Sequence, residues 1–145
     1  MNKNREIVVV EDNPDDELMI LDAFEENHVT NPIVVLRDGE EALDYFFARG
    51  KYSGRELHGS PLAILLDLNM PKVNGIEVLR ELRAHERTKT FVVIILTTST
   101  EQEDLVQSYE LGANSFVRKP VDFDEFNKKI KSLGYYWELV NIAPD

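Results

Sequence analysis

One unbroken apolar run, residues 62–66 (LAILL), most constrains the fold of this chain. The run ends at Asp67 and is followed by the turn-forming residues Pro71, Asn74 and Gly75. This pattern is typical of a strand that is buried on both faces, as in a parallel sheet. Ligand sites of such sheets lie beyond the carboxyl ends of the strands, where Asp67 falls. An ionised carboxylate there is costly without a cation or hydrogen-bond donors, so we expect the chain to supply them.

Further β-type runs alternate with helical patterns along the rest of the chain. The strands are predicted at residues 6–10, 33–36, 62–66, 91–96 and 115–118, each followed by a helix. Strands that alternate with helices predict an α/β fold, with a parallel sheet and helices on both faces. We expect a doubly wound, five-stranded, flavodoxin-like sheet in the order 2-1-3-4-5, with its crevice between strands 1 and 3. The glycine-containing stretch 50–60 is predicted to be a surface loop.

The composition fits one globular domain and excludes several kinds of site. The chain has 145 residues and a formal net charge of −11. A charge of this sign argues against nucleic acid or an anionic membrane surface as a partner, since both call for a basic patch. The chain has no cysteine, which excludes disulfides, thiol nucleophiles and cysteine-based zinc sites. We find no signal peptide or membrane-spanning stretch, and we expect a cytoplasmic protein.

The first predicted helix opens with two carboxylates, Asp15 and Asp16. Its apolar side is expected to carry Leu18, Leu21 and Phe24. Negative charge near a helix N-terminus stabilises the helix dipole. We therefore expect both carboxylates to serve the helix N-terminus and not a metal.

Polar side chains follow four of the predicted strands. Strand 1 ends in Glu11 and Asp12, strand 3 in Asp67, strand 4 in Thr97 and strand 5 in Lys119. Because parallel strands end at one edge of a sheet, we expect these side chains to lie close together. Two carboxylates about 4 Å apart repel by roughly 4 kcal/mol at an effective dielectric of about 20. A divalent cation with oxygen ligands relieves this repulsion, so the pattern predicts a Mg²⁺ site.

The same residue types suit phosphoryl chemistry. The carboxylate of Asp67, placed beside Mg²⁺ and the ammonium of Lys119, can attack phosphorus and form an aspartyl phosphate. Thr97 adds a hydroxyl donor. The cations would stabilise the charge that spreads over the oxygens of the transferring group.

Four short motifs in this order resemble the receiver domain of two-component response regulators. They are EDN after strand 1, DLNMP after strand 3, TTS after strand 4 and KP after strand 5. The resemblance spans residues 5–133. It implies a single-domain response regulator that accepts a phosphoryl group from a histidine kinase and signals by protein contact. It also implies a protein that is no enzyme beyond catalysing its own phosphorylation and dephosphorylation.

The resemblance assigns the acceptor and the metal ligands. Asp67 is the implied phosphoacceptor. Glu11 and Asp12 are the implied acidic pair that holds Mg²⁺, together with Asp67 itself and the backbone carbonyl of Asn69.

The resemblance also assigns the residues that bind and sense the phosphoryl group. Thr97 and Lys119 are implied to bind its oxygens. Phe116 occupies the position of an aromatic switch, which moves inward when Thr97 is drawn toward the phosphate. The peptide bond between Lys119 and Pro120 is often cis in this family.

The last segment, residues 134–145, is predicted to be separate from the receiver domain at residues 1–133, because Gly134 is expected to end the last helix. Its aromatic residues are Tyr135, Tyr136 and Trp137. Aromatic residues are enriched at protein contacts, so this tail either folds back on its own subunit or forms a homodimer arm. With the loop 50–60 and the TTS triplet, it resembles the single-domain regulators of bacterial and cyanobacterial phytochrome kinases. That resemblance implies a phytochrome-type kinase as the partner and a homodimer.

Two alternative functions stay open. An aspartyl-phosphate phosphatase of the haloacid dehalogenase type needs a second carboxylate where this chain has Asn69. A pure interaction or dimerisation module would keep the site with its phosphorylation vestigial. Incubation with a small phosphodonor distinguishes the receiver from the interaction module, because only an active acceptor gains mass on Asp67.

Overall fold

The computed structural model describes residues 5–57, 59–70, 72–98, 100–108 and 110–140, in which strands and helices alternate as predicted. The strands are β1 (Ile7–Val10), β2 (Ile33–Leu36), β3 (Ala63–Asp67), β4 (Val93–Thr97) and β5 (Ser115–Arg118). The α-helices are α1 (Pro14–Glu26), α2 (Gly39–Phe47), α3 (Gly75–Ala84), α4 (Thr100–Ser108) and α5 (Phe123–Val140). A short 3-10 helix, η2 (Gly50–Tyr52), opens the predicted loop. No helix within these residues is both long and apolar enough to cross a membrane.

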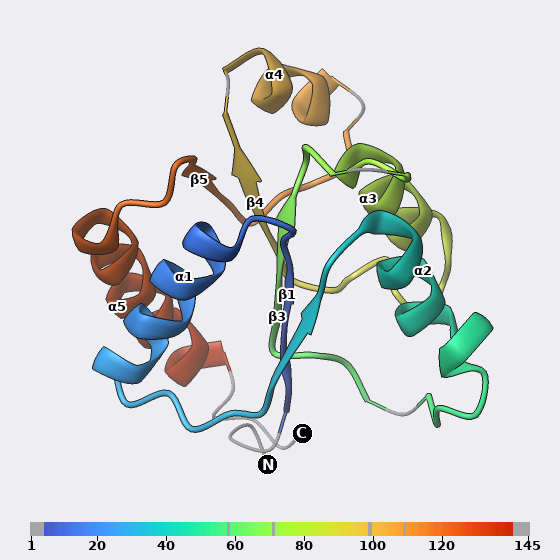
Figure 1. Cartoon of the computed structure of the whole chain (residues 1–145), viewed down its shortest axis with the longest axis horizontal. Coiled ribbons are helices and arrows are strands. Elements are labelled where there is room, and N and C mark those ends of the chain that lie inside the picture. Colours follow the sequence, from blue (N-terminus) through green and yellow to red (C-terminus); the bar gives the residue numbers. More distant parts are fainter. Residues whose placement is uncertain (1–4, 58, 71, 99, 109, 141–145) are drawn as a thin grey trace.

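The five strands form one parallel sheet in the order β2-β1-β3-β4-β5, which confirms the predicted flavodoxin-like topology. Figure 1 shows α1 and α5 on one face of this sheet and α2 and α3 on the other. The strand order reverses between β1 and β3, where Val10 pairs in register with Leu66. Glu11, which follows β1, and Asp67, the last residue of β3, therefore lie at the same level of the sheet.

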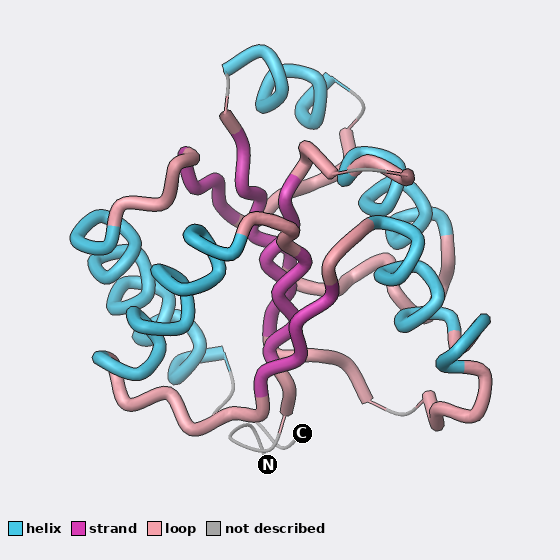
Figure 2. Tube along the Cα trace, viewed as in Figure 1, coloured by secondary structure: helices cyan, strands magenta, loops and turns pink. Residues whose placement is uncertain are grey.

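Alternate residues of each strand contribute to two apolar cores, one on each face of the sheet. Figure 2 shows helices on both sides of the strands. One core joins the strands to α2 and α3, and its fully buried members include Val8, Val10, Ile64, Leu66, Val78, Leu79 and Leu82. The other joins them to α1 and α5 and includes Ile7, Val9, Leu65, Ile20, Phe24, Phe126 and Ile130. Because helices cover both faces, β1 and β3 are buried along their whole lengths.

The buried side of α1 differs from the prediction. Leu18 was expected on it, but its side chain is 53% exposed. The buried residues of α1 are Asp16, Ile20, Ala23 and Phe24. Their spacing follows one stripe of a helix with 3.6 residues per turn. A carboxylate therefore occupies the first position of the stripe that faces the sheet.

The end of α5 also differs from the prediction. The helix continues through Gly134 to Val140, so Gly134 does not end it. A glycine inside a helix costs about 1 kcal/mol relative to alanine, which weakens a helix without stopping it. The predicted tail is thus helical as far as Val140. The side chains of Tyr135, Tyr136 and Trp137, and all of residues 141–145, lie outside the described part.

Candidate functional site

Asp67, the last residue of β3, has a fully buried side chain at the carboxyl edge of the sheet. Its Oδ2 lies 2.9 Å from Lys119 Nζ, and its Oδ1 accepts the backbone N–H of Asn69 at 2.9 Å. Both carboxylate oxygens therefore have a donor. The start of α3 packs against this strand end, since a Cβ added to Gly75 would lie 2.3 Å from the Asp67 backbone oxygen. A glycine at that position allows this close approach.

The ammonium of Lys119 gathers carboxylates from three separate parts of the chain. Its Nζ lies 3.0 Å from Glu11 Oε1, 2.9 Å from Asp67 Oδ2 and 3.3 Å from Asp16 Oδ2. Burial alone lowers the pKa of Lys119, but its hydrogen bonds and ion pairs with Asp67 and Glu11 raise that pKa above the ordinary lysine value. Lys119 is therefore a fixed positive charge. The peptide bond from Lys119 to Pro120 is cis.

Glu11 is a buried carboxylate with one unsatisfied oxygen. Its Oε1 accepts hydrogen bonds from Lys119 Nζ and from the backbone N–H of Asn13, both at 3.0 Å. Its Oε2 is buried and has no hydrogen-bond partner within the described residues. Burial first, and then the negative charge of Asp67, raises the pKa of Glu11 to about 7. An unsatisfied buried oxygen costs about 1–3 kcal/mol, which a cation at this point would recover.

The carboxylates fit the predicted divalent cation. Glu11, Asp12 and Asp67 each offer one oxygen, and these atoms lie within 4.8 Å of one another. Glu11 and Asp67 are buried, whereas Asp12 is exposed and opens the cluster to solvent. Oxygen-only ligand sets favour hard cations such as Mg²⁺ or Mn²⁺. The backbone carbonyl of Asn69 stays a predicted ligand, because the structure gives it no contact in this cluster.

The hydroxyl of Thr97 bonds to α4 and not to the acceptor. Thr97 is fully buried at the end of β4, and its Oγ1 donates to Gln102 Oε1 at 2.6 Å. Gln102 in turn donates through Nε2 to Asn69 Oδ1 at 2.6 Å. The Gln102 side chain therefore bridges the loops that follow β3 and β4. The sequence analysis missed this residue, because a glutamine in the first turn of a helix is ordinary.

The sequence analysis expected Asp16 to serve the helix N-terminus, but its side chain has different partners. The N-terminus of α1 is capped by Asn13, whose Oδ1 accepts the backbone N–H groups of Asp15 and Asp16. The Asp16 side chain is buried, and its Oδ1 accepts the N–H of Val121 at 2.8 Å while Oδ2 pairs with Lys119. Asp16 thus holds the loop after β5 in place. It lies on the stripe of α1 that faces the sheet, with Ile20, Ala23 and Phe24.

Phe116 lies on β5, in register with Ile95 of β4. It is partly buried and packs against the core on the α2 and α3 face. Its role as an aromatic switch stays a prediction.

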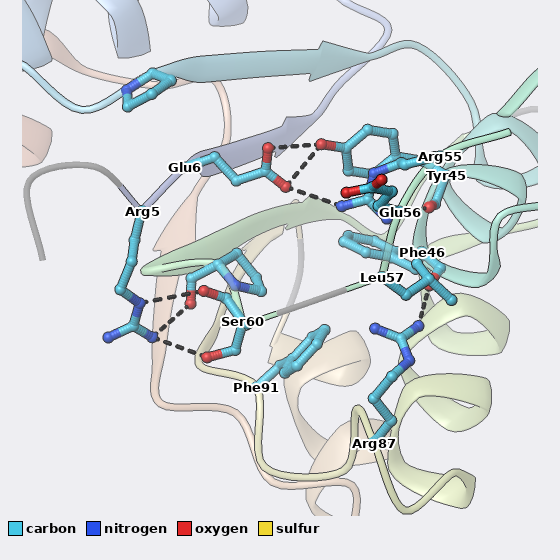
Figure 3. Close-up of a pocket in the computed structure, with 13 residues that line it drawn as sticks. Arg5, Glu6, Tyr45, Phe46, Arg55, Glu56, Leu57, Ser60, Arg87 and Phe91 are labelled. Carbon is cyan, nitrogen blue, oxygen red and sulfur yellow. Dashed lines mark hydrogen bonds and ion pairs between the residues drawn. The ribbon is translucent and has the colours of Figure 1, made fainter. Parts of the chain in front are cut away.

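A cavity of about 540 Å³ lies at the opposite edge of the sheet, where β1, β3 and β4 begin (Figure 3). Arg5, Arg55 and Arg87 line it. Their guanidinium groups donate to the backbone carbonyls of Ser60, Pro61, Tyr45 and Phe46. Arg55 also pairs with Glu6 at 3.3 Å. Arg5 and Arg55 thus connect the segment between α2 and β3 to the start of β1, and Arg87 connects the segment after α3 to α2.

The family follows from a comparison with known proteins. Residues 7–131 match the model of the response regulator receiver domain. The chain belongs to the response regulator receiver family. This match confirms the predicted family, and it indicates a signalling protein without pointing to any catalytic enzyme family.

Two known regulatory proteins align with nearly the whole of this chain. FilR2 of Methanothrix harundinacea, named a probable methanogenesis regulatory protein, is 39% identical over 138 residues, or 95% of this chain and 86% of its own. Response regulator Rcp1 of Synechocystis is 32% identical over 136 residues, or 94% of this chain and 90% of its own.

Solved structures with the same fold include response regulators that are described as phytochrome-linked. The bacteriophytochrome response regulator RtBRR has a TM-score of 0.80 at 44% identity, over 90% of this chain and 78% of its own. The phosphorylated cyanobacterial phytochrome response regulator RcpA has a TM-score of 0.78 at 33% identity, over 97% of both chains. The Mn²⁺-bound form of Rcp1 has a TM-score of 0.76 at 31% identity, over 92% of this chain and 94% of its own. A relative with this fold therefore binds a divalent cation.

Proposed function

We propose that this receiver domain accepts a phosphoryl group on Asp67 and signals by protein contact within a two-component phosphorelay. One observation carries the proposal: the buried Asp67 carboxylate lies 2.9 Å from Lys119 Nζ, beside the carboxylates of Glu11 and Asp12. A buried acceptor, a fixed cation and an oxygen ligand set are the parts that phosphoryl transfer to a carboxylate requires.

In the proposed reaction an oxygen of Asp67 forms a bond to phosphorus while the bond between phosphorus and the donor breaks. The donor keeps the electron pair of the broken bond. Lys119 holds a positive charge against the oxygens of the transferring group, and Thr97 supplies a hydroxyl donor. Glu11, Asp12 and Asp67 would hold Mg²⁺, which adds positive charge to the site when bound.

We assign the donor to a histidine kinase of the phytochrome type. The support is the likeness to RtBRR and RcpA, which are 44% and 33% identical and are described as phytochrome response regulators. FilR2, at 39% identity, carries a name from methanogenesis. Phosphotransfer from a purified phytochrome-type kinase, compared with transfer from any histidine kinase that phosphorylates FilR2, distinguishes the two candidate donors.

Intact mass after incubation with Mg²⁺ and acetyl phosphate tests the acceptor. The wild type is expected to gain one phosphoryl group, and Asp67→Asn none, because an amide is a poor nucleophile at phosphorus. A chelator should prevent the gain. Asp22→Asn removes an exposed carboxylate of α1 and serves as the matched control, with labelling unchanged. An unlabelled wild type, where a known receiver is labelled, would favour the interaction module.

We further propose a homodimer that uses the C-terminal part of α5, on the basis of its aromatic residues. The wild type is expected at twice the chain mass of 16.7 kDa in light scattering. Trp137→Ser should shift the population toward 16.7 kDa, because aromatic side chains dominate the binding energy of interfaces. Leu57→Ser replaces an exposed apolar side chain elsewhere and should leave the mass unchanged. An intact dimer in Trp137→Ser would remove that residue from the interface.

A further inference from the structure

The side chain of Gln102 holds the hydroxyl that the proposed reaction needs. We infer that Gln102 is a latch: its Oε1 accepts the hydrogen bond of the Thr97 hydroxyl in the unphosphorylated protein. It loses that bond, and its hold on α4, when a phosphoryl group on Asp67 takes its place as the acceptor. This inference rests on the proposed function and extends it to a residue in α4 that positions Thr97.

The Thr97 hydroxyl can donate one hydrogen bond at a time. A threonine hydroxyl has one proton to donate. Thr97 Oγ1 gives it to Gln102 Oε1 at 2.6 Å, so it cannot also donate to a phosphoryl oxygen. Hydrogen bonds to ionised acceptors are about twice as strong as those between neutral groups. A phosphoryl group on Asp67 is therefore a better acceptor than the Gln102 amide. The Thr97 hydroxyl is expected to break its hydrogen bond to Gln102 and to donate to a phosphoryl oxygen.

Gln102 also belongs to a hydrogen-bonded network that joins the segment after β3 to the segment after β4. Gln102 Nε2 donates to Asn69 Oδ1 at 2.6 Å, and Asn69 Nδ2 donates to Thr98 Oγ1 at 3.1 Å. The backbone N–H of Asn69 donates to Asp67 Oδ1 at 2.9 Å. The same asparagine thus touches both the acceptor and the latch. A change at Asp67 reaches Gln102 through Asn69 as well as through Thr97.

Within the described residues, α4 buries few side chains. Val106 is the one buried residue in the described part of this helix, and Leu105 is 44% exposed. Figure 1 places α4 beyond the edge of the sheet, apart from the pairs of helices on its faces. Arg118 donates to the backbone oxygen of Thr98 and to Thr100 Oγ1, both at 3.3 Å, and pairs with Glu103 at 3.1 Å. Its side chain is 48% exposed, and exposed pairs of this kind contribute little. Elements with few buried contacts open at low cost, so losing the latch frees α4.

The predicted consequence is a faster acceptor. A latch that stabilises the unphosphorylated arrangement opposes phosphorylation to the same extent. Gln102→Leu keeps the approximate side-chain size and removes the hydrogen bonds of the Gln102 amide, including the one from Thr97. Loss of the Thr97 bond should raise the rate of labelling by acetyl phosphate about fivefold, the equilibrium weight of one ordinary hydrogen bond. Gln107→Leu makes the same change on an exposed position of α4 and should leave the rate unchanged. Equal rates in the two variants would overturn the latch.

A double variant separates the latch from a general loosening of the helix. In the Thr97→Ala background the hydroxyl is gone, so adding Gln102→Leu should accelerate labelling less than it does in the wild type, because only the bond to Asn69 is then lost. The same acceleration in both backgrounds would show that Gln102 acts independently of Thr97 and would refute the proposal.

Hydrogen exchange tests the latch without phosphorylation. In the unphosphorylated protein, amides of α4 should exchange about fivefold faster in Gln102→Leu than in the wild type. The loss of one hydrogen bond raises the population of the locally open state by about that factor. Gln107→Leu should match the wild type. Unchanged protection in Gln102→Leu would overturn the latch whatever the labelling shows. A wild type that takes no phosphoryl group would instead defeat the proposed function, and the exchange result would still decide whether Gln102 holds α4.

Discussion

Replacing Lys119 with methionine is expected to slow phosphorylation of Asp67 about 100-fold, the effect of removing one preorganised donor from a site of developing negative charge. The Lys119 side chain is 10% exposed, and its ammonium lies 2.9 Å from the acceptor. Water therefore cannot easily replace it. Methionine keeps the apolar stem of the lysine, so the change removes the charge and little else.

The rate is measured by intact mass against time with acetyl phosphate and saturating Mg²⁺. Lys131→Met is the matched control, because Lys131 is an exposed lysine on α5. Circular dichroism checks the fold, since Lys119→Met leaves Glu11, Asp16 and Asp67 without their shared ammonium. A folded Lys119→Met protein that is labelled as fast as Lys131→Met would show that Lys119 has no part in the transfer.

Mg²⁺ at 100 times its dissociation constant is expected to raise the free energy of unfolding by about 2.7 kcal/mol. The reason is the cluster of Glu11, Asp12 and Asp67, which repel one another in the metal-free protein and leave Glu11 Oε2 unsatisfied. Asp12→Asn should remove most of this gain, because it takes away the exposed ligand. In the presence of chelator the same variant should be more stable than the wild type by up to about 1 kcal/mol, since one repelling charge is gone.

Urea unfolding with Mg²⁺ and with chelator measures both effects of Asp12→Asn. Asp15→Asn is the control, because it changes an exposed carboxylate near the cluster that is not part of it. It should keep the full stabilisation by Mg²⁺. The metal site proposed for Asp12 would be wrong if Asp12→Asn gained as much stability from Mg²⁺ as Asp15→Asn.

The sheet could be predicted from the sequence because its signals are local. The run at residues 62–66 and the alternation of strands with helices define a parallel α/β sheet, and the structure has that sheet in the predicted order. The edge that carries the site followed from the same argument. Parallel strands end together, so Glu11, Asp67 and Lys119 had to meet once the sheet was known, and they do so within 3.0 Å of the lysine nitrogen.

The buried face of α1 could not be predicted, because apolar residues occur on more than one side of the helix. Residues 18–21 read LMIL, so more than one stripe of the helix fits the pattern. Packing against the sheet decided for the stripe that contains Ile20 and leaves Leu18 53% exposed. The same rotation turned Asp16 inward, where it bonds to Val121, 105 residues away. The sequence by itself determined the fold and the edge that holds the acidic cluster. Only the tertiary structure decided that Asp16 and Gln102 belong to the site, because their partners come from elements far apart in the chain.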